Sequence, residues 1–165
     1  MVVPVRVCPG ITAASAAAAS LSTSLTLRGM ARKLTLVTAH ARAGEVLDLD
    51  WPALANSAAT LAIYMGKAAA QEISVQLIRA GLPANTPVAL VENASLADER
   101  QFRTRLDLLH LAAASALGDG PAILLIGEAM RPKINCPELG LDLMSTANPA
   151  AQIGKHFDEP ATRAE

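Results

Sequence analysis

Alternating apolar and polar residues, together with short apolar runs, predict the strands of this chain. Residues 33–40 (KLTLVTAH) alternate apolar with polar side chains, which is the pattern of a half-buried strand. Elsewhere the signal is a short apolar run that ends at Gly, Pro or Asn, as in residues 60–64 before Met65-Gly66. The expected strands are residues 2–7, 33–40, 60–64, 87–92, 99–106 and 122–127.

Between these strands the pattern changes to one typical of helices. Residues 67–80 repeat apolar side chains at helical spacing and are followed by Gly81, a common residue after a helix. Asp50 and Pro52 are the residue types expected at the start of a short helix. The expected helices are residues 11–21, a short helix from Trp51, residues 67–80 and residues 106–117, with loops at 22–32 and 41–50.

The alternation of strands with helices predicts an α/β fold. We expect a sheet of about five strands flanked by helices. The direct step from residues 87–92 to residues 99–106 leaves room for a hairpin, so the sheet is expected to be mixed. The acidic and basic residues of 99–105 are expected to form the solvated face of an edge strand.

The periodic pattern stops near Met130, which sets the expected domain boundary. Residues 1–130 are predicted to form one α/β domain, a usual size for a single core. Residues 131–165 carry Pro and Gly at irregular intervals and little periodicity. We expect them to form an irregular or loosely attached tail.

Composition narrows the classes of function. Hydrophobic residues make up 52% of the chain and aromatic residues only 2%, so Ala, Val, Leu and Ile must fill the core. The net charge of −1 and the scarcity of aromatic side chains argue against a nucleic-acid partner. No apolar run approaches the ~20 residues of a membrane span, and the first residues do not resemble a signal peptide. We therefore expect a cytoplasmic protein with no membrane partner.

Classical catalytic and metal-binding patterns are sparse. The three histidines, His40, His110 and His156, and the two cysteines, Cys8 and Cys136, do not have metal-ligand spacing. The two thiols are expected to be unrelated and reduced. No nucleophile elbow, phosphate-binding loop or dinucleotide fingerprint is present in the sequence. We assign no catalytic residue and no metal ligand.

Small residues at the ends of the expected strands are the candidate ligand contacts. Thr12 offers a hydroxyl and a free N–H at a helix start, next to the Pro9-Gly10 turn. Met65 follows an apolar strand, where its backbone could contact the edge of an adenine. Residues 92–95 and 120–122 are two similar points. At each of them an ordinary turn between a strand and a helix is the alternative.

Six motifs in one order carry a resemblance to a known family. They are VCPGITAAS, LTLRGMARKLTLVTAH, DW at 50–51, TLAIYMG, GLP-x-x-TPVALVENAS and GPAILLIGEAM. Residues 2–130 resemble the C-terminal half of the uroporphyrinogen-III C-methyltransferases, a branch of the tetrapyrrole methylases that also forms the last module of sirohaem synthase. The resemblance implies two α/β domains with S-adenosylmethionine between them. It also implies methylation of uroporphyrinogen III at C2 and C7, which gives precorrin-2.

The resemblance also implies roles for individual residues. Thr12 and Ala13 match positions near the methionine part of the cofactor. Met65 matches a main-chain contact to adenine, Ala94 a second backbone contact, and Ala122 a nearby wall of the site.

The resemblance also implies one substrate contact, and the sequence departs from the family pattern at a few positions. Arg28, in the LT-x-R segment, could face the carboxylates of the tetrapyrrole. Leu27 stands where many members have His, and Ala94 where many have Gly. The loops of the family's N-terminal domain are not found in this sequence.

Two readings of function follow from the resemblance. In the first, the chain is the cofactor-binding part of a methyltransferase and is expected to be inactive without the N-terminal domain. In the second, it is a non-catalytic binding or dimerisation module that keeps the fold, and a weaker third reading is a methylase for another substrate. Half of a two-domain protein leaves an apolar face uncovered, so we expect a homodimer or association with a chain that supplies the other domain.

Overall fold

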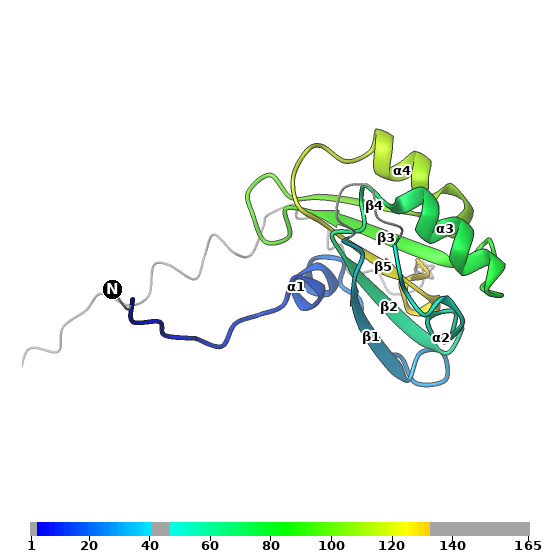
Figure 1. Cartoon of the computed structure of the whole chain (residues 1–165), viewed down its shortest axis with the longest axis horizontal. Helices are drawn as coiled ribbons and strands as arrows, with labels where there is room; N and C mark the ends of the chain where they lie inside the picture. Colours follow the sequence, from blue (N-terminus) through cyan, green and yellow to red (C-terminus); the bar gives the residue numbers. More distant parts are fainter. Residues whose placement is uncertain (1–2, 41–46, 133–165) are drawn as a thin grey trace, which may run out of the picture. The chain divides into compact units, whose positions relative to one another are not determined.

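A five-stranded mixed sheet forms the centre of the structure, a computed structural model that describes residues 3–40 and 47–132 (Figure 1). The spatial order of the strands is β1-β2-β5-β3-β4. The strands are β1 (Lys33–Thr38), β2 (Ala59–Tyr64), β3 (Pro87–Glu92), β4 (Arg100–Arg105) and β5 (Ala122–Ile126). The helices are α1 (Ala13–Ser20), α2 (Trp51–Leu54), α3 (Ala70–Arg79) and α4 (Leu109–Ser115), with the 3₁₀ turns η1 (Leu106–Leu108) and η2 (Glu128–Met130).

Strand directions divide the sheet into two ends. β1 and β2 are parallel, whereas β5 runs antiparallel to both β2 and β3, and β4 antiparallel to β3. Strands β1, β2 and β3 therefore end where β4 and β5 begin. We call this end the Tyr64 rim, because Tyr64, Glu92 and Ala122 lie there, and the opposite end, where β5 runs into Gly127, the Gly127 rim.

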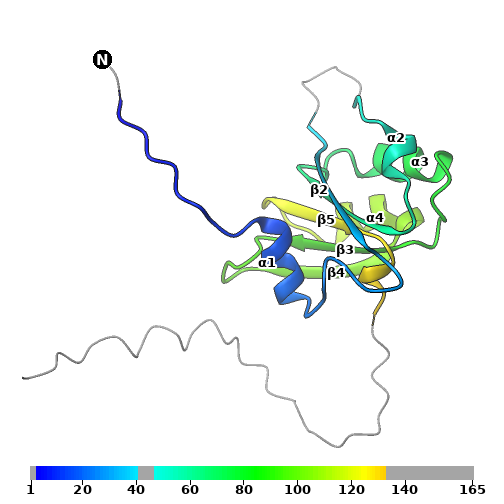
Figure 2. The same ribbon diagram turned by 90° about the horizontal axis from the view of Figure 1, so that it is seen from below.

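Helices cover both faces of the sheet (Figures 1 and 2). Helix α1 packs on one face, where its alanines allow a close approach to the small side chains of the strands. The core on this side contains Ala14, Ala17, Ala62, Ala89, Val91, Leu125 and Met130. Helices α3 and α4 cover the other face, and that core contains Ile63, Ile73, Leu77, Leu90, Leu109 and Leu124. The inner strand β3, which lies between β5 and β4, is buried along its whole length, as expected for a strand covered on both faces.

Local signals explain where the helices begin and end. The Thr12 hydroxyl accepts a hydrogen bond from the Ser15 N–H at 3.1 Å, so Thr12 caps α1. Asp50 caps α2 in the same way, through the Ala53 N–H at 3.1 Å. Gly81 follows α3 with φ of +107°, a conformation that glycine adopts without a steric penalty.

Most of the elements expected from the sequence are confirmed. The strands expected at 33–40, 60–64, 87–92, 99–106 and 122–127 form β1 to β5, and the expected hairpin joins β3 to β4. The helix expected at 106–117 is divided into η1 and α4. The fold class, a mixed α/β sheet of about five strands, is as predicted.

One expected strand is wrong. Residues 3–7 are extended but are not part of the sheet, and Val3, Val5 and Val7 are between 72% and 90% exposed. A strand is defined by its ladder to a neighbour, and none of the five strands pairs with this segment. The alternating valines indicate a high β propensity but cannot specify a neighbouring strand to pair with.

The charged residues of the edge strand β4 were expected to face solvent, and Arg103 is the exception. Arg103 donates from Nη1 to the Met130 carbonyl at 2.7 Å and from Nη2 to the Leu21 carbonyl at 3.1 Å. Its guanidinium therefore joins β4 to the ends of α1 and η2. Arg100 and Arg105 are exposed, as expected.

Several expectations concern residues outside the described ranges. The loop expected at 41–50 is described only from residue 47, and Cys136 and His156 lie beyond residue 132. The tail expected at 131–165 is described only at Arg131 and Pro132, so that division of the chain stays a prediction.

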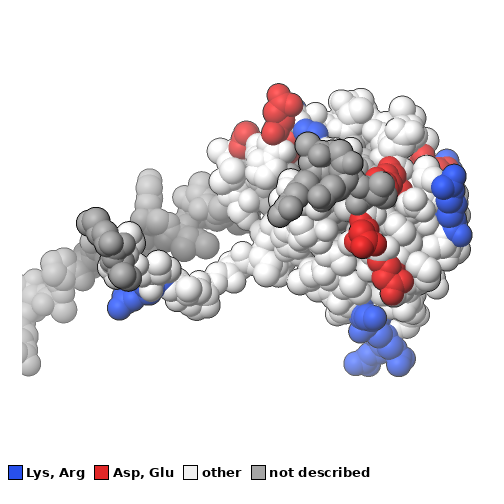
Figure 3. All heavy atoms as spheres, viewed as in Figure 1, with Lys and Arg blue, Asp and Glu red and all other residues white. Residues whose placement is uncertain are grey.

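Charged side chains of both signs are scattered over the face of the molecule in Figure 3, with uncharged surface between them. Within residues 3–40 and 47–132, no helix is long and apolar enough to cross a membrane.

Candidate functional site

The Tyr64 rim brings together residues from three separate segments. Met65 follows β2, Ala94 lies two residues beyond β3, and Ala122 begins β5. The strand register pairs Tyr64 with Ile123 and Glu92 with Ala122. Sheet pairing therefore places three of the five predicted cofactor contacts at one end of the sheet.

The other two predicted contacts lie at the start of α1. The Ala14 N–H donates to the Tyr64 hydroxyl at 3.2 Å, which joins the first turn of α1 to the end of β2. Thr12 and Ala13 directly precede this contact and are exposed. All five predicted cofactor contacts thus belong to segments that meet at the Tyr64 rim.

The backbone after the strands of this rim adopts rare conformations. Met65 has φ of 54°, Asn93 φ of 54° and Ser95 φ of 69°, in the left-handed region that non-glycine residues seldom occupy. Residues in such conformations are held there by their surroundings and occur preferentially at binding sites. The residue after Met65 is Gly66, where an added Cβ would come within 3.1 Å of buried side chains of β2, β5 and α3, so the chain is closely packed at this point.

A groove of about 630 Å³ opens beside Met65, between α3 and α4. Its polar side chains are Lys67, Gln71 and His110. The predicted residues Met65 and Ala122 both line it. Sequence reasoning did not select these three polar residues, because a single His or Lys on a helix is usually only a surface residue. Lys67 could have been found from its position three residues beyond the end of β2, whereas Gln71 and His110 reach the groove only because α3 and α4 pack together.

Glu92 is the buried charged residue of this rim, with 1% of its surface exposed. Its carboxylate accepts hydrogen bonds from the Gly118 N–H at 2.7 Å and the Gly120 N–H at 2.9 Å. Lys67 Nζ lies 3.6 Å from the same carboxylate. The Gly118 hydrogen bond is the main cause of a lowered pKa for Glu92, helped by Gly120, Lys67 and Arg100, while burial acts in the opposite direction.

Arg28, the predicted substrate contact, lies away from these residues. It belongs to the turn closed by the Leu27–Ala31 bridge, and the Arg32 N–H bonds the Ala58 carbonyl just before β2. The turn is therefore at the Gly127 rim. A groove of about 400 Å³ lies there, lined by Thr26, Leu27, Arg28, Ala31 and Arg32.

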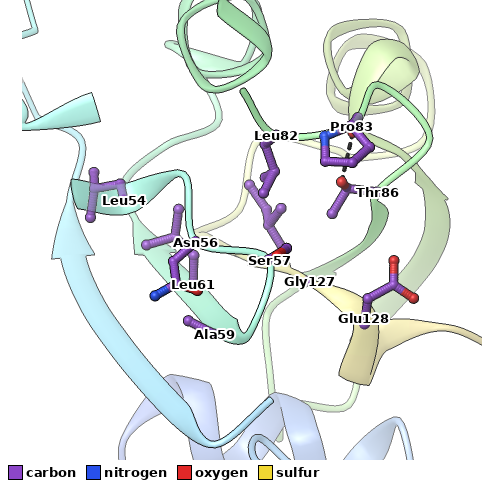
Figure 4. A pocket seen from close by; sticks show the side chains of 11 residues that line it. Leu54, Asn56, Ser57, Ala59, Leu61, Leu82, Pro83, Thr86, Gly127 and Glu128 are labelled. Carbon is purple, nitrogen blue, oxygen red and sulfur yellow. Dashed lines mark hydrogen bonds between the residues drawn. The ribbon is translucent and has the colours of Figure 1, made fainter. Parts of the chain in front are cut away.

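A second cavity near the Gly127 rim is too small for a ligand (Figure 4). Its volume of about 30 Å³ corresponds to roughly one water molecule. Figure 4 shows the Thr86 hydroxyl, which donates to the Pro83 carbonyl at 2.6 Å, on its wall. In the part of the chain that the structure describes, no cluster of three or more His, Cys, Asp or Glu side chains could hold a metal ion.

Sequence comparison connects this arrangement to known proteins. The family model for Tetrapyrrole (Corrin/Porphyrin) Methylases matches residues 1–109. The chain is 45% identical over 125 residues to a uroporphyrinogen-III C-methyltransferase of Pseudomonas fluorescens, a match covering 76% of this chain and 50% of that protein. It is 42% identical over 136 residues to a siroheme synthase of Gluconacetobacter diazotrophicus, covering 82% of this chain and 29% of the relative. The chain thus spans half or less of the length of these relatives.

Solved structures of the same family share the fold. A cobalt precorrin-4 methyltransferase of cobalamin biosynthesis has a TM-score of 0.68 at 28% identity, over 75% of this chain and 52% of that chain. The uroporphyrin-III C-methyl transferase of Thermus thermophilus, complexed with S-adenyl homocysteine, has a TM-score of 0.62 at 32% identity, over 78% and 55%. Because the family model matches residues 1–109, most of this chain, the chain belongs to the tetrapyrrole (corrin/porphyrin) methylases.

Proposed function

We propose that this chain is the C-terminal, cofactor-binding part of an S-adenosylmethionine-dependent uroporphyrinogen-III C-methyltransferase. The observation that carries the proposal is the convergence of Thr12, Ala13, Met65, Ala94 and Ala122 on the Tyr64 rim. Relatives at 42–45% identity are named for this activity or for siroheme synthesis.

The rim fits an adenosyl group through its backbone. Met65 lines the groove, has a left-handed backbone and is 56% exposed, so we expect a ligand in the groove to reach its N–H and C=O. Ala94 and Ala122 are half-buried and carry only a methyl group, so a ligand can approach their backbone closely. Thr12 and Ala13 lie at the start of α1, where the positive end of the helix dipole favours a negatively charged group such as a carboxylate.

The contribution of this chain to methyl transfer is binding and orientation. Bound S-adenosylmethionine supplies an activated methyl group, and methyl transfer depends largely on holding two reactants in line. We assign no proton-transferring residue to this chain. Activity on a tetrapyrrole is therefore proposed to require a second half in addition to the residues described.

Arg28 is proposed to bind a carboxylate of the tetrapyrrole. The turn that carries Arg28 is separated from the Tyr64 rim by the eight residues of α1, which extend about 12 Å. Arg32 lines the same groove and could form a second contact. A large substrate with several carboxylates is the kind of ligand that could reach both ends of the domain.

A partner chain is proposed to cover the exposed apolar residues. Val7 and Ile11 are 90% and 85% exposed, and Leu96 beyond β3 is 58% exposed. Exposed apolar surface of this kind favours association. The partner is either a second copy of the chain or a chain that carries the other half. We also propose a cytoplasmic location, where the exposed Cys8 thiol would stay reduced.

The experiment that tests the proposal is chemical-shift mapping with S-adenosylhomocysteine, which does not turn over. The isotope-labelled chain would be titrated alone and with the half of the Pseudomonas fluorescens enzyme that it does not match. Shifts of the Ala13, Met65, Ala94 and Ala122 amides, with Arg28 unchanged, support the proposal. Binding elsewhere or no binding in either sample refutes it and favours the non-catalytic dimerisation module.

A further inference from the structure

We propose that Glu92 is a positioning residue whose buried carboxylate fixes the relative positions of the loops that form the Tyr64 rim. The inference rests on the proposed function, because those loops are the ones expected to contact the cofactor. It assigns a task to a side chain that touches no proposed ligand atom.

The first observation is that Glu92 joins two segments far apart in the sequence. Each of its carboxylate oxygens accepts one backbone N–H, Oε2 from Gly118 at 2.7 Å and Oε1 from Gly120 at 2.9 Å. These glycines precede Ala122, the first residue of β5. The fit is close, since a Cβ on Gly118 would lie 3.2 Å from the Glu92 Oε2 atom. The loop before β5 is thus held directly by the end of β3.

The second observation is that the same carboxylate reaches the loop after β2. Lys67 Nζ lies 3.6 Å from Glu92 Oε1, and Lys67 is two residues beyond Met65. The Lys67 side chain is 29% exposed and that of Glu92 only 2%, so the anion is the fixed member of the pair. One carboxylate therefore connects the segments that carry Met65 and Ala122.

The third observation is that Glu92 begins the turn leading to Ala94. The Asn93 N–H donates to the Pro121 carbonyl at 2.9 Å, and the Asn93 side-chain amide donates to Asp98 at 2.7 Å. These bonds extend the connection into the third loop. All three proposed backbone contacts then depend on one buried anion and its neighbours.

The charged groups around Glu92 keep it ionised. Lys67 from the loop after β2 and Arg100 from the start of β4 both lower its pKa, in addition to the two glycine N–H groups. An ionised carboxylate has two acceptor oxygens and no donor, which matches two converging N–H groups. A glutamine has one acceptor and one NH₂ group, so it must turn a donor towards one of the two glycines.

This arrangement matters because a site that binds its ligand through backbone atoms cannot be adjusted by side-chain rotation. The positions of the Met65, Ala94 and Ala122 backbones are fixed by how their loops are held. Small displacements of binding groups have large effects on ligand binding and transfer. A residue that only stabilised the fold would change the unfolding equilibrium but leave the ligand affinity of the folded protein unchanged.

The test compares Glu92→Gln with Glu128→Gln. Glu128 lies at the Gly127 rim, where its carboxylate pairs with Arg131, so the control makes the same chemical change away from the Tyr64 rim. Both variants and the unaltered 165-residue chain would be studied with the unmatched half of the Pseudomonas fluorescens enzyme present. The readouts are the dissociation constant of S-adenosylhomocysteine by calorimetry, well below the unfolding temperature, and amide hydrogen exchange at Gly118 and Gly120.

We expect Glu92→Gln to weaken S-adenosylhomocysteine binding about tenfold, the scale of one unpaired buried donor, and to accelerate exchange at the two glycines. Glu128→Gln is expected to leave both readouts unchanged. Faster exchange with an unchanged dissociation constant overturns the positioning role and leaves Glu92 structural. Unchanged exchange overturns the inference itself. If the unaltered chain binds no S-adenosylhomocysteine, the proposed function fails and this inference fails with it.

Discussion

Replacement of Gly66 by alanine is the change to which the Tyr64 rim should be most sensitive. An added Cβ would lie 2.9 Å from Ile63 Cγ2, 2.9 Å from Leu124 Cδ1 and 3.1 Å from Ile73 Cδ1. Carbon atoms that are not bonded prefer separations of about 3.5–4.0 Å, so each contact is too short by roughly half an ångström. The three side chains are fully buried and cannot move into solvent.

The expected cost is therefore one of overpacking. Forcing an extra carbon into a filled core destabilises a protein by about 1–3 kcal/mol, and three simultaneous contacts favour the middle or upper part of that range. The backbone would relieve the contacts by moving outwards and carry the Met65 turn with it. We therefore expect Gly66→Ala to lose about 2 kcal/mol of stability and to weaken S-adenosylhomocysteine binding.

The assay is urea unfolding followed by circular dichroism, with Gly10→Ala as the matched control. A Cβ on Gly10 would meet nothing within 4 Å, so this variant should stay within about 0.5 kcal/mol of the parent. The urea concentration at the unfolding midpoint is compared between variants that share the same m-value, the slope of the unfolding free energy against urea concentration. An unchanged m-value shows that the variant changes stability rather than the surface exposed on unfolding. Equal midpoints for the two variants would refute the reasoning, because the close packing at Gly66 would then have no energetic consequence.

Three further predictions concern other contacts of the domain. Ser74→Ala removes the buried hydroxyl that donates to the Leu106 carbonyl at 2.6 Å, and should lower the urea stability by about 1–2 kcal/mol; a loss near zero would contradict the value given to this bond. Gly120→Ala would bring a Cβ within 2.8 Å of Asn93 Cγ, but that side chain can move, so we expect a loss below about 1 kcal/mol together with weaker S-adenosylhomocysteine binding by calorimetry. Because the pKa of Glu92 is lowered from 4.5, its stabilising effect is present above that pH and is lost as the pH falls through the folded value. The thermal midpoint should therefore fall less steeply below about pH 4.5 in Glu92→Gln than in the parent, and parallel curves would contradict this.

Local sequence signals were sufficient for most of the fold. The apolar run of residues 87–92 becomes the fully buried β3, and Asp50 and Thr12 cap helices as their residue types suggest. These outcomes depend on neighbours within a few positions, which a linear pattern contains. The strand predicted at residues 2–7 failed because a strand also needs a partner, and no local pattern specifies one.

The site was predictable in its segments but not in its contacts. The sequence indicated the turns after β2 and β3, and sheet pairing brings them together. Residues 92–95 were a candidate point, but the contacts of Glu92 were not predicted because its partners are 26 and 28 residues away, and the Ala14–Tyr64 bond spans 50 residues. Arg103 was assigned to a solvated face for the same reason, since the carbonyls that it binds belong to distant segments.

The most direct test of the central claim is calorimetric titration of S-adenosylhomocysteine into this chain with the unmatched half of the Pseudomonas fluorescens enzyme present. The claim is that the Tyr64 rim holds the cofactor through the backbone that follows β2 and β3. We predict saturable binding by the unaltered chain and markedly weaker binding by Gly66→Ala, measured where both are folded. Absence of binding, or equal affinity for the two chains, would contradict the account.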